Sequence, residues 1–238
     1  DLIPNKALFY FILGCIKKDK IQYKEALDCF NKAISLKQDF ADAYNNKGSV
    51  LRYIGRLKEA EESFKKALEL NSNLIFAHSN ILALQSSNNT DPVIHLNEAK
   101  NYGKRVSAKA NKVFSQWNYS EDSNCLNIGF VSADFFNHPV GYFLENILNS
   151  IDKSRIKLFA YSNSFKDDDL TEKLKQNFLS WKQISNKSDA GTAQLIHDDG
   201  IHILFDLSGH TAKNRLPVFA YKPAPIQVTW LGYWATTG

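Results

Sequence analysis

The chain has 238 residues, of which 44 % are hydrophobic, so it is long enough for one large domain or two modest ones with buried cores. Its net charge of +4 is a mild excess without the lysine and arginine stripe of a nucleic-acid binder, which argues against a nucleic-acid partner. The three cysteines, Cys15, Cys29 and Cys125, are widely spaced, which argues against a disulfide framework or a zinc site and favours a reducing, cytoplasmic compartment.

A self-similarity with a period of 34 residues runs through the first part of the chain. Small and aromatic residues recur at this offset: Gly14, Ala26, Phe30 and Ala33 return as Gly48, Ala60, Phe64 and Ala67. This period and pattern are typical of tetratricopeptide repeats, in which each repeat is a pair of antiparallel helices. A third repeat begins near Ile75, and its helical pattern ends at Ser86. We predict a repeat region, with trailing helices, over residues 1–106.

The apolar stretch at residues 7–16 belongs to this repeat pattern. It is about ten residues long, too short to cross a bilayer, so we expect a repeat helix, no signal peptide and no membrane partner. The chain contains no methionine, not even at position 1, and we interpret it as a piece of a longer protein that is open at both ends.

Two asparagines, Asn46 and Asn80, occupy the same position of successive repeats. In stacked helix pairs, amides at such a position can hydrogen-bond the backbone of an extended polypeptide without reading its sequence. We therefore predict a polypeptide partner for the repeats. The alternative is that both are ordinary surface asparagines.

A further helix is predicted after Pro92, because apolar residues recur at helical spacing up to Val106. The polar segment 107–125 follows it and is predicted to be a linker that packs through its aromatic residues, Trp117 and Tyr119.

From residue 126 the pattern changes to short apolar runs that alternate with helical patterns. Strands are predicted at 126–131, 157–161, 201–207 and 226–230, and helices at 142–151, 170–178 and 190–197. This alternation predicts a Rossmann-like parallel sheet over residues 126–238, with helices on both faces. The fold class is therefore α + α/β.

Ligands of such sheets bind at the carboxyl ends of the strands, so the loops after the strands are the candidate sites. The first loop contains Asp134, Asn137 and His138, and Pro139 fixes the backbone where a helix would start. The pKa of a histidine side chain lies near neutrality, so His138 could act as a general base or bind a ligand. The alternative is that it caps or packs the loop.

Two more histidines are candidates. His210 follows Ser208 and Gly209, which permit close approach of a ligand to the backbone, although an ordinary turn histidine is an equal alternative. His202 lies inside a predicted strand, where a structural histidine is more common than a catalytic one. The acidic run 167–169 is expected to complement a helix dipole, so we predict no metal site.

Five motifs follow the repeats in order: IGFVSADF at 128–135, NHP at 137–139, DGIHIL at 199–204, DLSGHT at 206–211 and PAPIQVTWLGY at 223–233. With the repeats, they make the chain resemble the O-linked N-acetylglucosamine transferase and SPINDLY family, with bacterial-type members the most similar. The resemblance covers nearly the whole chain. It implies that residues 126–238 are the N-terminal half of a GT-B glycosyltransferase that is inverting and metal-independent.

The resemblance also implies roles for individual residues. It places His138 at the active site, where it has been considered as a base, and His202, His210 and Thr211 in the same cleft, with Asp206 supporting the loop. We also expect Asp134 and Asn137 to contact substrate. The repeats would guide a polypeptide acceptor to a nucleotide-sugar donor, UDP-N-acetylglucosamine, and no cofactor is expected.

Two departures from the family pattern bear on this interpretation. Trp234 and Ala235 follow Tyr233 where proline and glycine are usual, which could reshape a loop facing the acceptor. The chain also ends before the second Rossmann-like domain, so this fragment is expected to be inactive alone. The alternatives are a non-catalytic repeat protein that binds polypeptides, or the same fold acting on fucose or glucose.

Overall fold

The computed structural model describes residues 3–88, 90–117 and 125–238. The chain divides into two compact units, one ending at Glu98 and the other beginning at Ala99. In the described part, no helix is long and apolar enough to cross a membrane.

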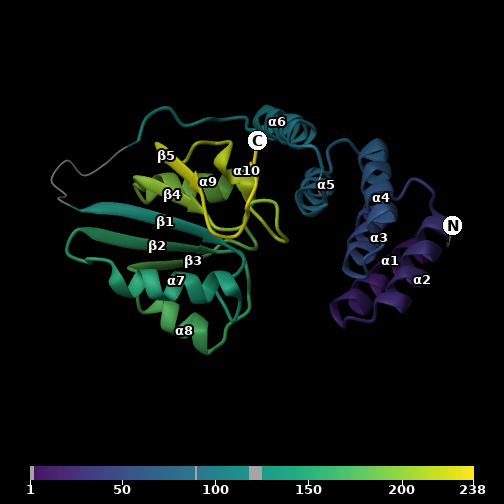
Figure 1. Cartoon of the computed structure of the whole chain (residues 1–238), viewed down its shortest axis with the longest axis horizontal. Coiled ribbons are helices and arrows are strands. Elements are labelled where there is room, and N and C mark those ends of the chain that lie inside the picture. Colours follow the sequence, from purple (N-terminus) through teal and green to yellow (C-terminus); the bar gives the residue numbers. More distant parts are fainter. Residues whose placement is uncertain (1–2, 89, 118–124) are drawn as a thin grey trace. The chain divides into compact units, whose positions relative to one another are not determined.

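The first unit is a series of helices in antiparallel pairs (Figure 1). Its helices are α1 (Ile3–Asp19), α2 (Tyr23–Leu36), α3 (Ala41–Tyr53), α4 (Leu57–Leu70) and α5 (Ile75–Ser87), followed by the start of α6 (Pro92–Lys109). The predicted repeats are confirmed, and the third repeat ends within two residues of the predicted position.

The repeating glycines lie where two paired helices approach most closely. A Cβ added at Gly14 would lie 2.7 Å from the ring of Phe30, and one added at Gly48 would lie 2.7 Å from the ring of Phe64. Both phenylalanines are fully buried in one apolar cluster. The 34-residue period therefore reflects a repeated helix-to-helix contact between a glycine and a phenylalanine ring.

The second unit contains a five-stranded sheet. Its elements, after the end of α6, are β1 (Leu126–Ser132), α7 (Pro139–Ser150), β2 (Ile156–Ser162), α8 (Asp169–Lys175), β3 (Ser180–Gln183), α9 (Asp189–Asp198), β4 (Ile203–Asp206), α10 (Leu216–Phe219) and β5 (Ile226–Thr229). The strand order is β3-β2-β1-β4-β5 and every neighbouring pair is parallel. The predicted Rossmann-like sheet is confirmed.

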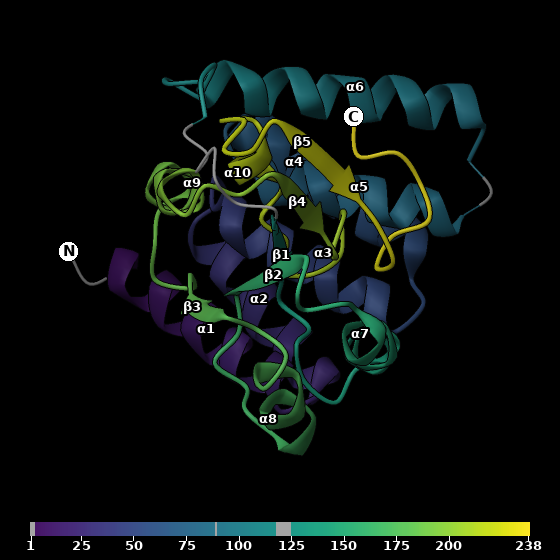
Figure 2. The ribbon, with the colours of Figure 1, turned by 90° about the vertical axis from the view of Figure 1, so that its left-hand side faces the viewer.

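Helices cover both faces of this sheet, as Figure 1 shows from the side and Figure 2 from the amino ends of the strands. On one face, Leu144 of α7 and Leu174 of α8 pack against Leu158 of β2. On the other face, Ile196 of α9 and Val218 of α10 pack in a second cluster.

Two elements were missed by the sequence prediction. Strand β3 is polar in sequence and all four of its residues are only partly buried, so it carries no apolar run. Helix α10 has four residues, too few for a helical period to be read from the sequence.

The predicted linker packs on the second unit through its aromatic residues. Phe114 is buried and stacks on His197 at 4.0 Å, and the indole of Trp117 donates a hydrogen bond to the Lys222 carbonyl at 3.0 Å. Tyr119 lies outside the described residues. Helix α6 extends three residues beyond position 106, and the domain boundaries at 106 and 125 stay a prediction.

Candidate functional site

The centre of the sheet contains the point where ligands bind in folds of this kind. Strands β1 and β4 are neighbours, and the chain leaves β1 toward α7 on one face and β4 toward α10 on the other. A crevice forms where neighbouring strands send their connections to opposite faces, at the carboxyl ends. Residues 133–138 and 207–215 follow these two strands, at the edge where such a crevice is expected.

The first of these loops is held by the start of α7. His138 is the N-cap residue, and its Nδ1 accepts a hydrogen bond from the Val140 N–H at 3.3 Å. A Cβ at Gly141 would lie 2.5 Å from the Phe136 carbonyl oxygen, so the glycine allows the loop to fold tightly on the helix. The structure therefore shows His138 capping the helix, and its catalytic role stays a prediction.

Asp134 lies in the same loop and is partly buried. Its N–H donates to Ser132 Oγ at 2.9 Å. Burial raises the pKa of the Asp134 carboxyl. Positive charge acts in the opposite direction, on His138 when its ring is protonated and on Lys213 and Lys166. Asp134 and His138 thus lie in one loop and interact electrostatically, and two lysines that the sequence prediction missed add to this interaction.

Asn137 connects this loop to α8. Its N–H donates to Asp168 Oδ2 at 2.7 Å, and the residue is exposed. Asp168 also caps α8 in a capping box with Thr171, and these hydrogen bonds, led by that from Asn137, lower its pKa. The acidic run 167–169 belongs to a helix start, as predicted. Among the described residues, no group of three or more His, Cys, Asp or Glu side chains could hold a metal ion.

The loop after β4 is organised by Asp206, which is fully buried. Its carboxylate accepts hydrogen bonds from the N–H groups of Ser208 at 3.0 Å and Gly209 at 2.8 Å, and burial raises its pKa to about 6. Gly209 has φ 54°, and a Cβ there would lie 2.2 Å from Cβ of Tyr233. Asp206 therefore supports the loop, and its buried carboxylate does not face a substrate.

Thr211 lies one turn further along this loop. Its hydroxyl donates to the Ser208 carbonyl at 2.8 Å, and the residue is partly exposed near the crevice. Its predicted contact with substrate stays a prediction.

The structure places His210 inside the loop. The residue is 1 % exposed, and its ring lies edge-on to Tyr102 at 4.6 Å and to Tyr233 at 5.3 Å between centroids. The left-handed turn at Gly209 directs the following side chain into an aromatic cage. His210 thus packs inside the loop, as the alternative of a turn histidine predicts, and its catalytic role stays a prediction.

The placement of His202 differs from the expectation. The His202 ring accepts a hydrogen bond at Nδ1 from the Asn127 backbone N–H at 3.0 Å. The backbone N–H of His202 donates to the Asn127 carbonyl at 2.9 Å. These contacts join β1 and β4 at their amino ends. Asp206 is four residues further along, roughly 13 Å at the rise of a strand, so His202 lies at the opposite edge from His138.

The asparagines of the repeats bond to neighbouring helices of their own unit. Asn46 accepts from Lys18 Nζ at 2.7 Å and donates to the Asp42 carbonyl at 3.0 Å, and Asn80 donates to Asn45 Oδ1 at 2.9 Å. They are partly exposed. Binding of a polypeptide by these amides stays a prediction.

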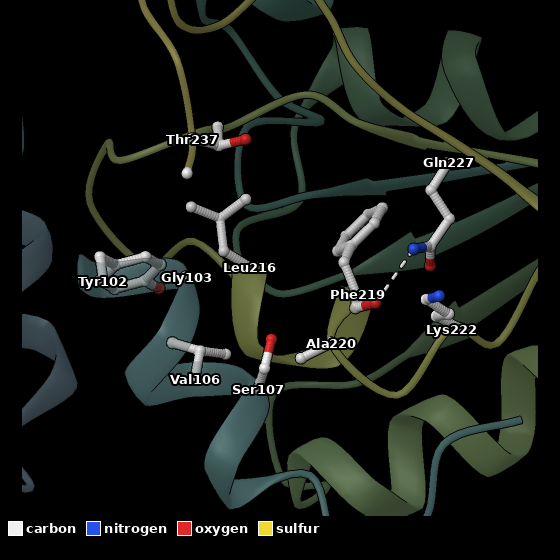
Figure 3. A pocket seen from close by; sticks show the side chains of 11 residues that line it. Tyr102, Gly103, Val106, Ser107, Leu216, Phe219, Ala220, Lys222, Gln227 and Thr237 are labelled. Carbon is white, nitrogen blue, oxygen red and sulfur yellow. Dashed lines mark hydrogen bonds between the residues drawn. The ribbon is translucent and has the colours of Figure 1, made fainter. Parts of the chain in front are cut away.

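A cavity of about 240 Å³ lies elsewhere in the second unit, between α6 and α10 (Figure 3). Its lining includes Tyr102, Leu216, Phe219 and Gln227, and the Gln227 amide donates to the Phe219 carbonyl at 3.0 Å. None of the predicted site residues lines this cavity.

The fold defines a class of protein: tetratricopeptide repeats joined to a Rossmann-like domain, in which the switch point between β1 and β4 is the candidate ligand site. The profile of glycosyl transferase family 41 matches residues 91–238, and tetratricopeptide repeat profiles match 18–52 and 41–74. The chain belongs to glycosyl transferase family 41.

Related proteins match the chain over about half its length. It is 38 % identical to the SPINDLY protein of Arabidopsis thaliana over 130 residues, which are 52 % of the chain and 14 % of that protein. It is 42 % identical over 117 residues to the UDP-N-acetylglucosamine–peptide N-acetylglucosaminyltransferase of Caenorhabditis elegans, or 48 % of the chain and 10 % of that protein. The chain thus spans a small part of these relatives.

A solved structure matches almost the whole chain. It is a mutant of the O-GlcNAc transferase of Thermobaculum terrenum, with a TM-score of 0.88 and 31 % sequence identity, covering 97 % of this chain and 44 % of the other.

Proposed function

We propose that the full-length protein transfers a sugar, N-acetylglucosamine from UDP-N-acetylglucosamine, to serine or threonine hydroxyls of a polypeptide. Membership of glycosyl transferase family 41 supports this reaction class, and the names of the relatives support the donor. The observation that carries the proposal is that Asp134 and His138 lie in one loop, at the carboxyl ends of the central strands. The reaction is proposed to invert the sugar and to need no metal or cofactor.

In this proposal His138 orients a substrate oxygen. Since its Nδ1 accepts the Val140 N–H, the neutral ring carries its proton on Nε2. A ring in this state donates a hydrogen bond from Nε2 and does not take up a proton there. The cap at α7 therefore favours positioning by His138 over its action as a general base.

Asp134 supplies a proton acceptor beside it. A hydroxyl is a weak nucleophile, so its proton must be accepted as the bond to the sugar forms. Burial raises the pKa of Asp134, which makes its carboxylate a stronger base than one in water. Lys166 and Lys213 oppose this shift and favour its ionised form.

The repeats are proposed to bind the polypeptide acceptor. Their asparagines already bond to a backbone carbonyl of the same helix and to side chains of neighbouring helices, so an extended polypeptide would add bonds to amides whose orientation is set. Such contacts with main-chain groups would tolerate many acceptor sequences.

The test is a transfer assay with the full-length protein. The protein is incubated with a serine- and threonine-rich polypeptide and, in separate reactions, UDP-N-acetylglucosamine, GDP-fucose or UDP-glucose, and the acceptor is analysed by mass spectrometry. A mass gain with UDP-N-acetylglucosamine alone is expected. A gain only with another donor would change the sugar, and no gain with any donor would defeat the proposal in favour of a polypeptide-binding protein.

A further inference from the structure

Arg215, the N-cap residue of α10, lies at the end of the loop that flanks the crevice and is 8 % exposed. Its Nε donates a hydrogen bond to the Asp189 carboxylate at 3.0 Å. Its Nη1 donates to Asn163 Oδ1 at 3.2 Å and to the Ile184 carbonyl at 2.8 Å. Its Nη2 donates to the Lys187 carbonyl and to Thr192 Oγ1, both at 3.0 Å. A guanidinium group has five N–H donors, and here each has an acceptor.

These acceptors come from three different segments at the carboxyl edge of the sheet. Asn163 follows β2, Ile184 and Lys187 follow β3, and Asp189 and Thr192 lie in the first turn of α9. A planar fork that satisfies so many groups fixes their relative positions more strictly than a single charge would.

Asn163 extends this network back to the loop. Its Oδ1 accepts from Arg215, and its Nδ2 donates to the Lys213 carbonyl at 2.7 Å. Lys213 has φ 59°, in the left-handed region that a lysine adopts only when its surroundings hold it there. The hydrogen bond from Asn163 is one such restraint.

The restrained part of the loop is close to the candidate site. Lys213 is among the charges that act on the Asp134 carboxyl, and Thr211 lies two residues before it. A change of backbone conformation at Lys213 would therefore move groups on the β4 side of the crevice.

We propose that Arg215 and Asn163 are positioning residues, which hold the loop 207–214 in the conformation that the transfer reaction needs. The expected effect of these residues on the rate of sugar transfer rests on the proposed function. Neither residue is proposed to touch substrate. A purely structural role would instead predict that any break in the network lowers activity only as far as it lowers stability.

The variant Asn163→Asp separates the two roles. An aspartate at this position can still accept the Arg215 hydrogen bond, but it cannot donate to the Lys213 carbonyl. Asp189→Asn is the matched control, since it weakens the ion pair with Arg215 on the side of α9 and leaves the bond to Lys213 intact.

Two measurements are made on these variants. In the full-length protein, Asn163→Asp is expected to lower kcat about tenfold at an unchanged unfolding temperature, whereas Asp189→Asn keeps kcat and unfolds at a lower temperature. In the chain itself, hydrogen exchange of segment 207–215 is expected to rise in Asn163→Asp alone.

Unchanged kcat and unchanged exchange in Asn163→Asp would overturn the inference, and so would an equal loss of kcat in both variants. If the unsubstituted full-length protein transfers no sugar while exchange rises in Asn163→Asp, the proposed function fails and the restraint on the loop stands. The exchange measurement thus distinguishes the two failures.

Discussion

Replacing Asp206 by asparagine is expected to remove a pH dependence from the stability of the second unit. The carboxyl is fully buried, and its pKa rises from 3.8 to about 6. Because the folded pKa is the higher one, the folded state binds more protons than the unfolded state between these values. The contribution of Asp206 to the free energy of unfolding is therefore largest below about pH 4 and is lost as the pH rises through about 6.

The size of the effect follows from the two pKa values. A difference of about 2 pH units corresponds to about 3 kcal/mol, at 1.36 kcal/mol for each unit. Between pH 4 and pH 7, the free energy of unfolding of the wild type is expected to fall by about this amount relative to that of Asp206→Asn. The variant itself is less stable at pH 4, since its amide cannot accept from both Ser208 and Gly209.

The assay is urea unfolding followed by tryptophan fluorescence, which reports on the second unit because all four tryptophans lie there: Trp117, Trp181, Trp230 and Trp234. Asp198→Asn, which replaces an exposed carboxylate on α9, is the control for general charge effects. Parallel pH profiles for the wild type and Asp206→Asn would instead show that Asp206 does not titrate in this window.

Two further substitutions test the fold and the placement of a histidine. Gly48→Ala would bring a methyl group against the ring of Phe64 and is expected to destabilise the repeats by about 1–3 kcal/mol, measured by thermal unfolding with circular dichroism. Lys58→Ala, at an exposed position, is the control. A midpoint of Gly48→Ala that is unchanged and equal to that of the control would contradict the packing of Gly48 against Phe64. His202→Ala is expected to cost about 1–2 kcal/mol in urea unfolding, because the Asn127 N–H loses its acceptor, and to leave transfer by the full-length protein unchanged. Loss of transfer without loss of stability would instead show that His202 belongs to the active site.

The repeats and four of the five strands could be predicted from the sequence, because the repeats recur at a fixed period and these strands are apolar runs. The 34-residue period reflects a contact that recurs in each repeat, such as that of Gly48 with Phe64. Runs of branched apolar residues indicate buried strands. Strand β3 could not be found in this way, since Trp181 is the one apolar residue among its four and hydrogen bonds to β2 hold it in the sheet.

The candidate site was only partly predictable, because a motif gives residue types and not the direction of each side chain. Asp134 and His138 follow a strand directly, so their edge of the sheet was determined by the strand itself. The position of the His210 side chain depends on the turn at Gly209, which directs it inward. The position of His202 depends on where β4 begins, which is one residue after it. Arg215 carried no local signal, since its partners are distant in the sequence.

We infer that the carboxyl edge beside β1 and β4 is the catalytic site, and the decisive test of this claim is the variant His138→Ala. The initial rate of sugar transfer by the full-length protein is measured for His138→Ala and for His202→Ala, which removes a histidine from the opposite edge of the same sheet. A rate about a hundredfold lower for His138→Ala, with a wild-type rate for His202→Ala, is predicted. A wild-type rate for a folded His138→Ala variant would contradict the claim.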